Sequence, residues 1–295
     1  MRRRALFVQK PVPQYISERD GAWRLWFRSD LWNRELWGEL RDRLAAERPG
    51  RHPRTVEIRL AGAEQPLFLK AFYGASALGS FKDFFRRSKA VRSLVLTESF
   101  AGLGFNAPIA IGAGEERYAN LLRRSFVVTL PVHGCPLPFF LRDHWEKHAR
   151  GISLRQKRQA LAQLATEIRR LHDLGFVHGD LVPGNIFVAP TTDGTMGFCF
   201  MDNDRTRRYP TWLPHRLWRR NLVQLNRFPL AGISLQDRMR FFHAYTRRKK
   251  LARRDRKLVQ WLELKTRQRR RECDAVDASG SFRRLMRWDA TAHRA

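Results

Sequence analysis

A short polar loop enclosed by apolar stretches constrains the fold of this chain more than any other segment. It directly follows the clearest helical pattern, residues 153–174, which opens with a capping serine and carries leucine and isoleucine on one face. The loop segment, residues 176–188, contains three polar side chains that can take part in chemistry: His178, Asp180 and Asn185. These three residues are therefore the first candidates for a functional site.

The spacing of these residues is typical of phosphoryl transfer. Asp180 and Asn185 are five residues apart, as in the catalytic loop of kinases, where the aspartate accepts a proton from the substrate hydroxyl and the asparagine helps to hold Mg²⁺. Asp202 follows 17 residues after Asn185, where an apolar strand ends in acidic residues. A second metal-binding carboxylate is needed at such a place if the metal is to bridge the phosphates of ATP.

A cation for the nucleotide phosphates lies earlier in the chain. Lys70 lies near the end of the predicted strand 67–72, upstream of a Pro- and Gly-rich hinge at 131–138. Taken singly, each of these residues is typical of a solvated or capping side chain. Their order, with a strand lysine, a hinge, a long helix, His-Gly-Asp-x4-Asn and a strand-end aspartate, instead predicts a kinase-like protein.

The chain is β-rich at the front and helical at the back. Alternating polar and apolar residues predict strands, apolar residues at helical spacing predict helices, and Gly112 and Gly114 predict a turn. We therefore predict an α+β fold with two lobes, a β-rich N-lobe at 1–131 and an α-helical C-lobe at 132–295. Strands are expected at 22–28, 55–60, 67–72 and 125–130, and helices at 31–46, 88–103, 153–174 and about 215 to 272.

Three parts of the sequence resemble the lipopolysaccharide kinase family: Lys70, the run Leu-His-Asp-Leu-Gly-Phe-Val-His-Gly-Asp-Leu-Val-Pro-Gly-Asn at 171–185, and Met-Asp-Asn-Asp-Arg at 201–205. The Asp-x-Asp-Arg ending, in place of Asp-Phe-Gly, favours this family over protein kinases. Segments 219–227 and 238–245 are similar to the family's C-terminal helices. The resemblance implies a protein-kinase-like fold. It also implies an enzyme that phosphorylates Kdo or heptose sugars of the lipopolysaccharide inner core, with Kdo-lipid A or the inner core as acceptor.

The resemblance also implies a role for each matching residue. Asp180 is the expected catalytic base, and His178 is expected to brace its loop. Asn185 and Asp202 are the expected Mg²⁺ ligands, and Lys70 is the expected contact to the ATP phosphates. ATP and Mg²⁺ are therefore the expected cofactors.

Two features depart from the kinase pattern. No Gly-x-Gly-x-x-Gly precedes Lys70, and Gly62 reads only as a hairpin glycine, so no loop over the ATP phosphates is assigned. The acid expected to pair with Lys70 should lie on the predicted helix 88–103, where Glu98 is the only carboxylate. Ser93 occupies the position about a turn and a half earlier where that acid is expected.

Charge narrows the possible partners. Lys and Arg total 57 against 28 Asp and Glu, a net charge of +29, which attracts nucleic acid, anionic membrane surfaces or phosphorylated substrates. Thirteen basic residues lie within 247–271, interleaved with apolar ones. This pattern indicates an amphipathic helix whose basic face contacts an anionic membrane or substrate phosphates. We favour the membrane, although a nucleic-acid arm has the same pattern. No specific nucleic acid is expected.

The compartment follows from the N-terminus and the cysteines. The chain begins with three arginines and an apolar stretch, as a signal peptide does, but that stretch ends early at Gln9-Lys10-Pro11. The three cysteines offer no disulfide framework. We predict a cytoplasmic protein that is peripheral to the inner membrane.

Two other functions fit the same sequence. One is a protein or small-molecule kinase of the same superfamily. The other is a catalytically silent kinase-like module that binds nucleic acid or anionic membrane through its basic C-terminal helix. The joint presence of Lys70, Asp180, Asn185 and Asp202 argues against the silent module, because such a module has no chemical need for the whole set.

Overall fold

The protein divides into two compact units. The first comprises Met1–His133 and Cys199–Thr206, and the second comprises Gly134–Phe198 and Arg207–Ala295. Gly62 and the N-terminal residues that begin like a signal peptide lie outside the described residues. The computed structural model describes residues 15–31, 33–46, 54–60, 65–73, 87–141, 154–191, 195–212, 216–228, 230 and 232–278.

The first unit is built on a six-stranded antiparallel sheet with the order β1-β2-β5-β6-β4-β3. Strands β3 and β4 pair as the predicted hairpin. Strands β1 and β5 were not expected from the sequence pattern. The bounds are β1 (Tyr15–Asp20), β2 (Trp23–Arg28), β3 (Arg54–Ile58), β4 (Leu67–Tyr73), β5 (Ala110–Tyr118) and β6 (Leu121–Thr129).

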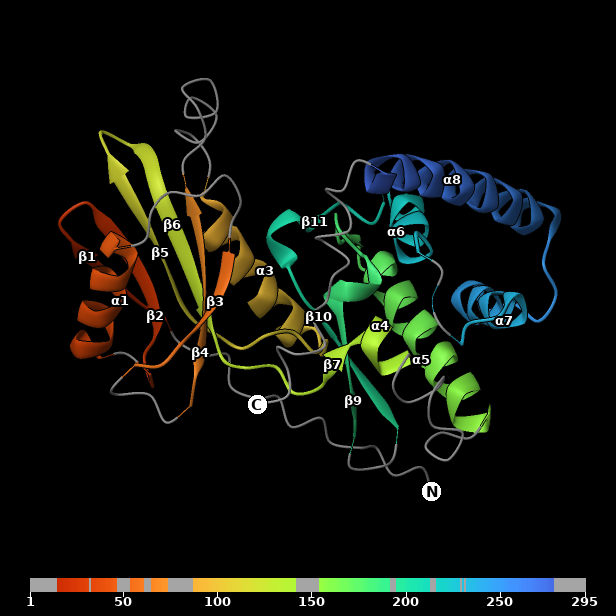
Figure 1. The fold of residues 1–295 in the computed structure, drawn as a ribbon, viewed down its shortest axis with the longest axis horizontal. Coiled ribbons are helices and arrows are strands. Elements are labelled where there is room, and N and C mark those ends of the chain that lie inside the picture. The colour runs from red at the N-terminus through yellow and green to blue at the C-terminus, as the bar shows by residue number, and fades with distance from the viewer. Residues whose placement is uncertain are drawn as a thin grey trace. The chain divides into compact units, whose positions relative to one another are not determined.

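Two helices cover opposite faces of this sheet (Figure 1). Helix α1 (Arg34–Ala46) buries its apolar stripe on one face, where the indole of Trp37 stacks on the ring of Phe126 at a centroid distance of 5.8 Å. Helix α3 (Lys89–Gly102) packs Ala90 and Leu94 on the other face, against Val127. Because successive strand residues point to opposite faces, Phe126 and its neighbour Val127 serve the two separate cores.

Gly112 and Gly114 lie inside β5, so the predicted turn at this place is wrong. A Cβ on Gly112 would stand 2.3 Å from the Phe27 ring, and a Cβ on Gly114 would stand 2.4 Å from the Phe126 ring. The glycines are thus required by the close approach of buried aromatic rings to the strand backbone, and not by a change of chain direction.

The second unit is mainly helical. Its long helix α5 matches the predicted helix 153–174 within one residue at each end. A boundary between the two units falls within β10, because Phe198 belongs to the second unit and Cys199 to the first. The helices are α4 (Leu137–Phe140), α5 (Leu154–Asp173), α6 (Trp218–Leu225), α7 (Leu235–Thr246) and α8 (Arg253–Ala278), and the strands are β7 (Cys135–Pro136), β8 (Phe176–Val177), β9 (Ile186–Pro190), β10 (Met196–Phe200) and β11 (Arg207–Arg208). None of the helices in the described ranges has the length and apolar character needed to cross a membrane.

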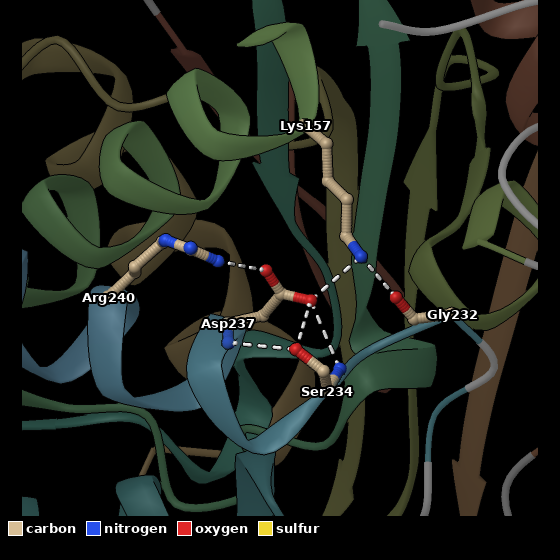
Figure 2. Close-up of polar contacts among 5 residues, drawn as sticks. All are labelled: Lys157, Gly232, Ser234, Asp237 and Arg240. Atoms are coloured by element: carbon tan, nitrogen blue, oxygen red, sulfur yellow. Dashed lines mark hydrogen bonds and ion pairs between the residues drawn. The ribbon is translucent and has the colours of Figure 1, made fainter. Parts of the chain in front are cut away.

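A buried carboxylate ties the start of α7 to α5 (Figure 2). Ser234 and Asp237 form a capping box, in which the Asp237 N–H donates to the Ser234 hydroxyl and the Ser234 N–H donates to the Asp237 carboxylate. Lys157 of α5 forms an ion pair with Asp237 at 2.7 Å and donates to the Gly232 carbonyl. Arg240 donates to the second carboxylate oxygen at 3.0 Å. This carboxylate therefore joins two helices and a loop.

This network predicts how stability depends on pH. Burial raises the pKa of Asp237, but the ion pair with Lys157 and the Ser234 hydrogen bonds outweigh burial and lower the pKa from 3.8 to about 2. The charged form then adds about 2 kcal/mol of stability that is complete above pH 3.8 and is lost as the pH falls through about 2. In urea unfolding we expect Asp237→Asn to be less stable than the wild type at pH 7, with a smaller difference at pH 3. An equal difference at both pH values would contradict this assignment, and Asp42→Asn, whose side chain is 82% exposed, is the control.

Candidate active site

The loop predicted to be catalytic lies in the second unit, between β8 and β9. Phe176, His178 and Leu181 are fully buried. Between them, Gly179 is exposed at a φ of +65°, in the left-handed region that glycine adopts without strain, and Asp180 is half-buried. Buried residues on both sides thus anchor a turn that leaves the Asp180 side chain in reach of solvent.

Asn185 is held by the backbone of the same loop. Its Nδ2 donates to the Asp180 carbonyl at 2.9 Å, and its own N–H donates to the Val182 carbonyl at 2.9 Å. Since Nδ2 is the amide atom turned to that carbonyl, Oδ1 is left as the atom available to a ligand. The spacing of Asp180 and Asn185 therefore corresponds to a direct contact within one loop.

Lys70 and Asp202 form an ion pair in the first unit, although they are 132 residues apart in sequence. Lys70 lies on β4, and Asp202 follows β10 at a φ of +58°, a left-handed conformation that aspartate tolerates better than most residues. Their side chains are 19% and 35% exposed, so the pair is partly shielded from water. The Phe200 N–H donates to the Asn106 carbonyl at 3.1 Å and holds the segment that ends in Asp202.

A second acid lies beside this pair. The Asp204 carboxyl is almost fully buried. Burial and the neighbouring Asp202 charge raise its pKa, while Lys70 opposes the rise. This part of the first unit thus gathers two carboxyl groups near one lysine.

Glu98 of α3 binds a different partner from the one expected. The Tyr15 hydroxyl donates to Glu98 at 2.7 Å, and it also lies 3.0 Å from the Ala110 carbonyl. Burial, followed by the hydrogen bond to Glu98, raises the pKa of Tyr15, so the hydroxyl keeps its proton. Within the described part of the chain, the ion pair of Lys70 is with Asp202, and none joins it to Glu98.

Two residues that contact the catalytic loop were not proposed from the sequence. Asn221 and Gln224 of α6 form hydrogen bonds with the loop backbone. The signal that could have indicated them is a pair of amide side chains three residues apart, on a helix whose neighbour Leu222 is buried.

Comparisons with known proteins give one family. The model of the lipopolysaccharide kinase (Kdo/WaaP) family matches residues 75–245. No match was found among curated protein sequences. A solved structure, "WaaP in complex with acyl carrier protein", is similar with a TM-score of 0.59 and 22% sequence identity, over 83% of this chain and 99% of that chain. The predicted α+β fold class and the predicted resemblance to lipopolysaccharide kinases are therefore confirmed.

Proposed function

Because the chain belongs to the lipopolysaccharide kinase (Kdo/WaaP) family, we propose that it transfers the γ-phosphoryl group of ATP to a sugar hydroxyl, of Kdo or heptose, in the lipopolysaccharide inner core. The observation that carries the proposal is the catalytic loop, in which Asn185 binds the Asp180 backbone and leaves the Asp180 carboxylate in reach of solvent. A loop of this kind matches the chemistry of phosphoryl transfer, where positioning and electrostatics supply most of the rate.

Asp180 has the role of base. Its carboxylate aligns the acceptor hydroxyl for in-line attack and accepts the hydroxyl proton as the new O–P bond forms and the bond to ADP breaks. His178 is fully buried directly before Gly179, and in this proposal it braces the loop. Lys70 orients the ATP phosphates by its positive charge.

The residues present fit a bound Mg²⁺. Magnesium prefers oxygen ligands and is usually held in proteins by one or two side chains, with substrate phosphates and water completing the shell. Asp202 offers a carboxylate and Asn185 an amide oxygen, and these two would hold the ion. Among the described residues there is no group of three or more His, Cys, Asp or Glu side chains that could hold a metal ion. When bound, Mg²⁺ neutralises charge on the ATP phosphates.

The test is transfer of labelled γ-phosphate from Mg²⁺ and ATP to separate acceptors: Kdo-lipid A, heptosylated core, a protein extract and water. We expect the wild type to label one of the two glycolipids and the Asp180→Ala variant, used as the blank, to label neither. Label on protein alone would make the chain a protein kinase of this superfamily. Phosphate release to water alone would overturn the glycolipid acceptor, and no ATP turnover at all would favour a silent binding module.

We further propose that α8 holds the enzyme at the anionic inner surface of the inner membrane. Asp255 and Thr266 are buried on one side of this helix, while Leu264 is 64% exposed on the other. The exposed residues that share the face of Leu264, at three- and four-residue spacing, are Arg253, Arg256, Lys257, Gln260, Arg267, Gln268, Arg271 and Glu272, of which five are basic and one is acidic. A basic helix face with an apolar centre suits the surface of a bilayer, where each Lys or Arg contributes about 1 kcal/mol.

Vesicle sedimentation tests this face. We expect the wild type to bind phosphatidylglycerol vesicles, to release them at high salt, and not to bind phosphatidylcholine vesicles. The triple variant Arg253→Glu, Arg256→Glu, Lys257→Glu should lose binding. A control with the same change of charge, Arg19→Glu, Arg43→Glu, Arg123→Glu, places the substitutions on exposed residues of the first unit and should bind as the wild type does. Equal losses in the two variants would show that net charge, and not α8, drives binding.

A further inference from the structure

We infer that Asn221 and Gln224 are positioning residues, which fix the backbone of the catalytic loop on both sides of Asp180. The inference rests on the proposed function, because it assigns Asp180 as the base. It concerns α6, a helix that makes its loop contacts through these two side chains.

The contacts flank the base. Before Asp180, the His178 N–H donates to Asn221 Oδ1 at 3.1 Å, and Gln224 Nε2 donates to the Gly179 carbonyl at 2.9 Å. After Asp180, the Leu181 N–H donates to Gln224 Oε1 at 3.3 Å. Two residues before the base and one after it are therefore held by two amide side chains, so the direction of the Asp180 side chain depends on α6.

The backbone fixes which way both amides point. A backbone N–H can only donate, so the Asn221 atom facing His178 has to be oxygen. A carbonyl can only accept, so the Gln224 atom facing Gly179 has to be nitrogen. The remaining pair then matches, because Asn221 Nδ2 donates to Gln224 Oε1 at 3.0 Å. Turning either amide over would set donor against donor or acceptor against acceptor, and the network has one consistent arrangement.

The network continues into the helical core. His172 Nε2 lies 3.0 Å from Asn221 Oδ1, and since that oxygen accepts, Nε2 carries the proton. His172 Nδ1 lies 2.9 Å from the Tyr245 hydroxyl, and burial raises the pKa of Tyr245. Helices α5 and α7 thereby support Asn221, which is itself fully buried.

Burying an amide side chain costs free energy unless its polar atoms form hydrogen bonds. Asn221 is fully buried, a position that an apolar side chain could also occupy. Such a side chain would leave the His178 N–H and the Gln224 side chain without these bonds. The two amides thus supply bonds to the loop backbone that apolar side chains cannot make.

The test uses two Gln224 variants. Gln224→Met keeps the length of the side chain and removes all three of its hydrogen bonds. We expect kcat to fall by about 10- to 100-fold, because a small displacement of a catalytic group costs this much, with the KM for ATP unchanged. Gln159→Met, the same change at an exposed residue of α5, should leave kcat unaltered.

Gln224→Glu separates positioning from general stability. A protonated glutamic acid donates to the Gly179 carbonyl and accepts from Leu181, whereas the charged form sets two acceptors together. The charged form can still accept from the Leu181 N–H and from Asn221 Nδ2 but cannot donate to the Gly179 carbonyl, so we expect kcat to fall although the side chain keeps its shape. A wild-type kcat in this variant would overturn the inference.

Hydrogen exchange keeps the inference testable without an acceptor. In Gln224→Met, the amide of Leu181 should exchange faster while the amides of α5 stay protected. Faster exchange with unchanged kcat would overturn the positioning role and leave the proposed function intact. If the wild type transfers no phosphate but the exchange pattern holds, the proposed function fails and the loop contact stands. Unchanged exchange at Leu181 would show that Gln224 does not hold the loop.

Discussion

Asp180→Asn is expected to lower kcat by about 10²- to 10⁴-fold, the range that a positioned general base contributes. The substitution preserves the shape of the side chain and the backbone carbonyl to which Asn185 donates. It removes the ability to accept the proton of the acceptor hydroxyl. The affinity for ATP and the melting temperature should therefore stay close to those of the wild type.

The matched control for this prediction is Asp173→Asn. Asp173 lies at the end of α5, forms ion pairs with Arg169 and Arg247 and is partly exposed. The chemical change is identical, and the expected loss of kcat is less than twofold, because surface ion pairs contribute little. Steady-state kinetics on the labelled glycolipid measures both variants. An Asp180→Asn enzyme that retained a tenth of the wild-type kcat would show that another group takes the proton.

The parts of the fold that sequence predicts well are those fixed by neighbouring residues. The long helix α5 and the loop after it are contiguous, so helical periodicity and the spacing of Asp180 and Asn185 describe them. The order of the six strands depends on pairings between distant segments, and periodicity carries no information about these. Strand β5 shows the consequence, because Gly112 and Gly114 read as a turn until the aromatic rings that they accommodate are known.

The candidate site divides in the same way. Lys70 and Asp202 were each expected from position in a pattern, but their ion pair joins residues 132 apart and required the structure. Glu98 was selected as the only carboxylate on its helix, and its partner turned out to be Tyr15, on a strand that the pattern did not reveal. Asn221 has a neutral side chain in a helix with no catalytic motif, so only its contact with His178 identifies it.

The ion pair between Lys70 and Asp202 leads to the second large prediction. Both residues are proposed to serve the nucleotide, and they form an ion pair with each other. Lys70→Met and Asp202→Asn should each lower kcat/KM by about 10²-fold or more, since each removes an electrostatic contact to the transferring phosphate or its metal. The double variant should be little worse than the worse single variant, because residues that act as a unit are not additive. Losses that multiply would show that the two residues act independently.

Binding of Mn²⁺, measured by its paramagnetic signal without nucleotide, separates the two roles further. In the wild type the Lys70 ammonium competes with a metal ion for the Asp202 carboxylate. Lys70→Met removes the competing cation, so this variant should bind Mn²⁺ more tightly than the wild type although its activity is lower. Asp202→Asn removes the ligand and should bind Mn²⁺ more weakly. Tighter Mn²⁺ binding together with lower activity in Lys70→Met is expected only if Asp202 is the metal ligand and Lys70 serves the phosphates. Equal Mn²⁺ affinity in all three proteins would contradict that division of roles.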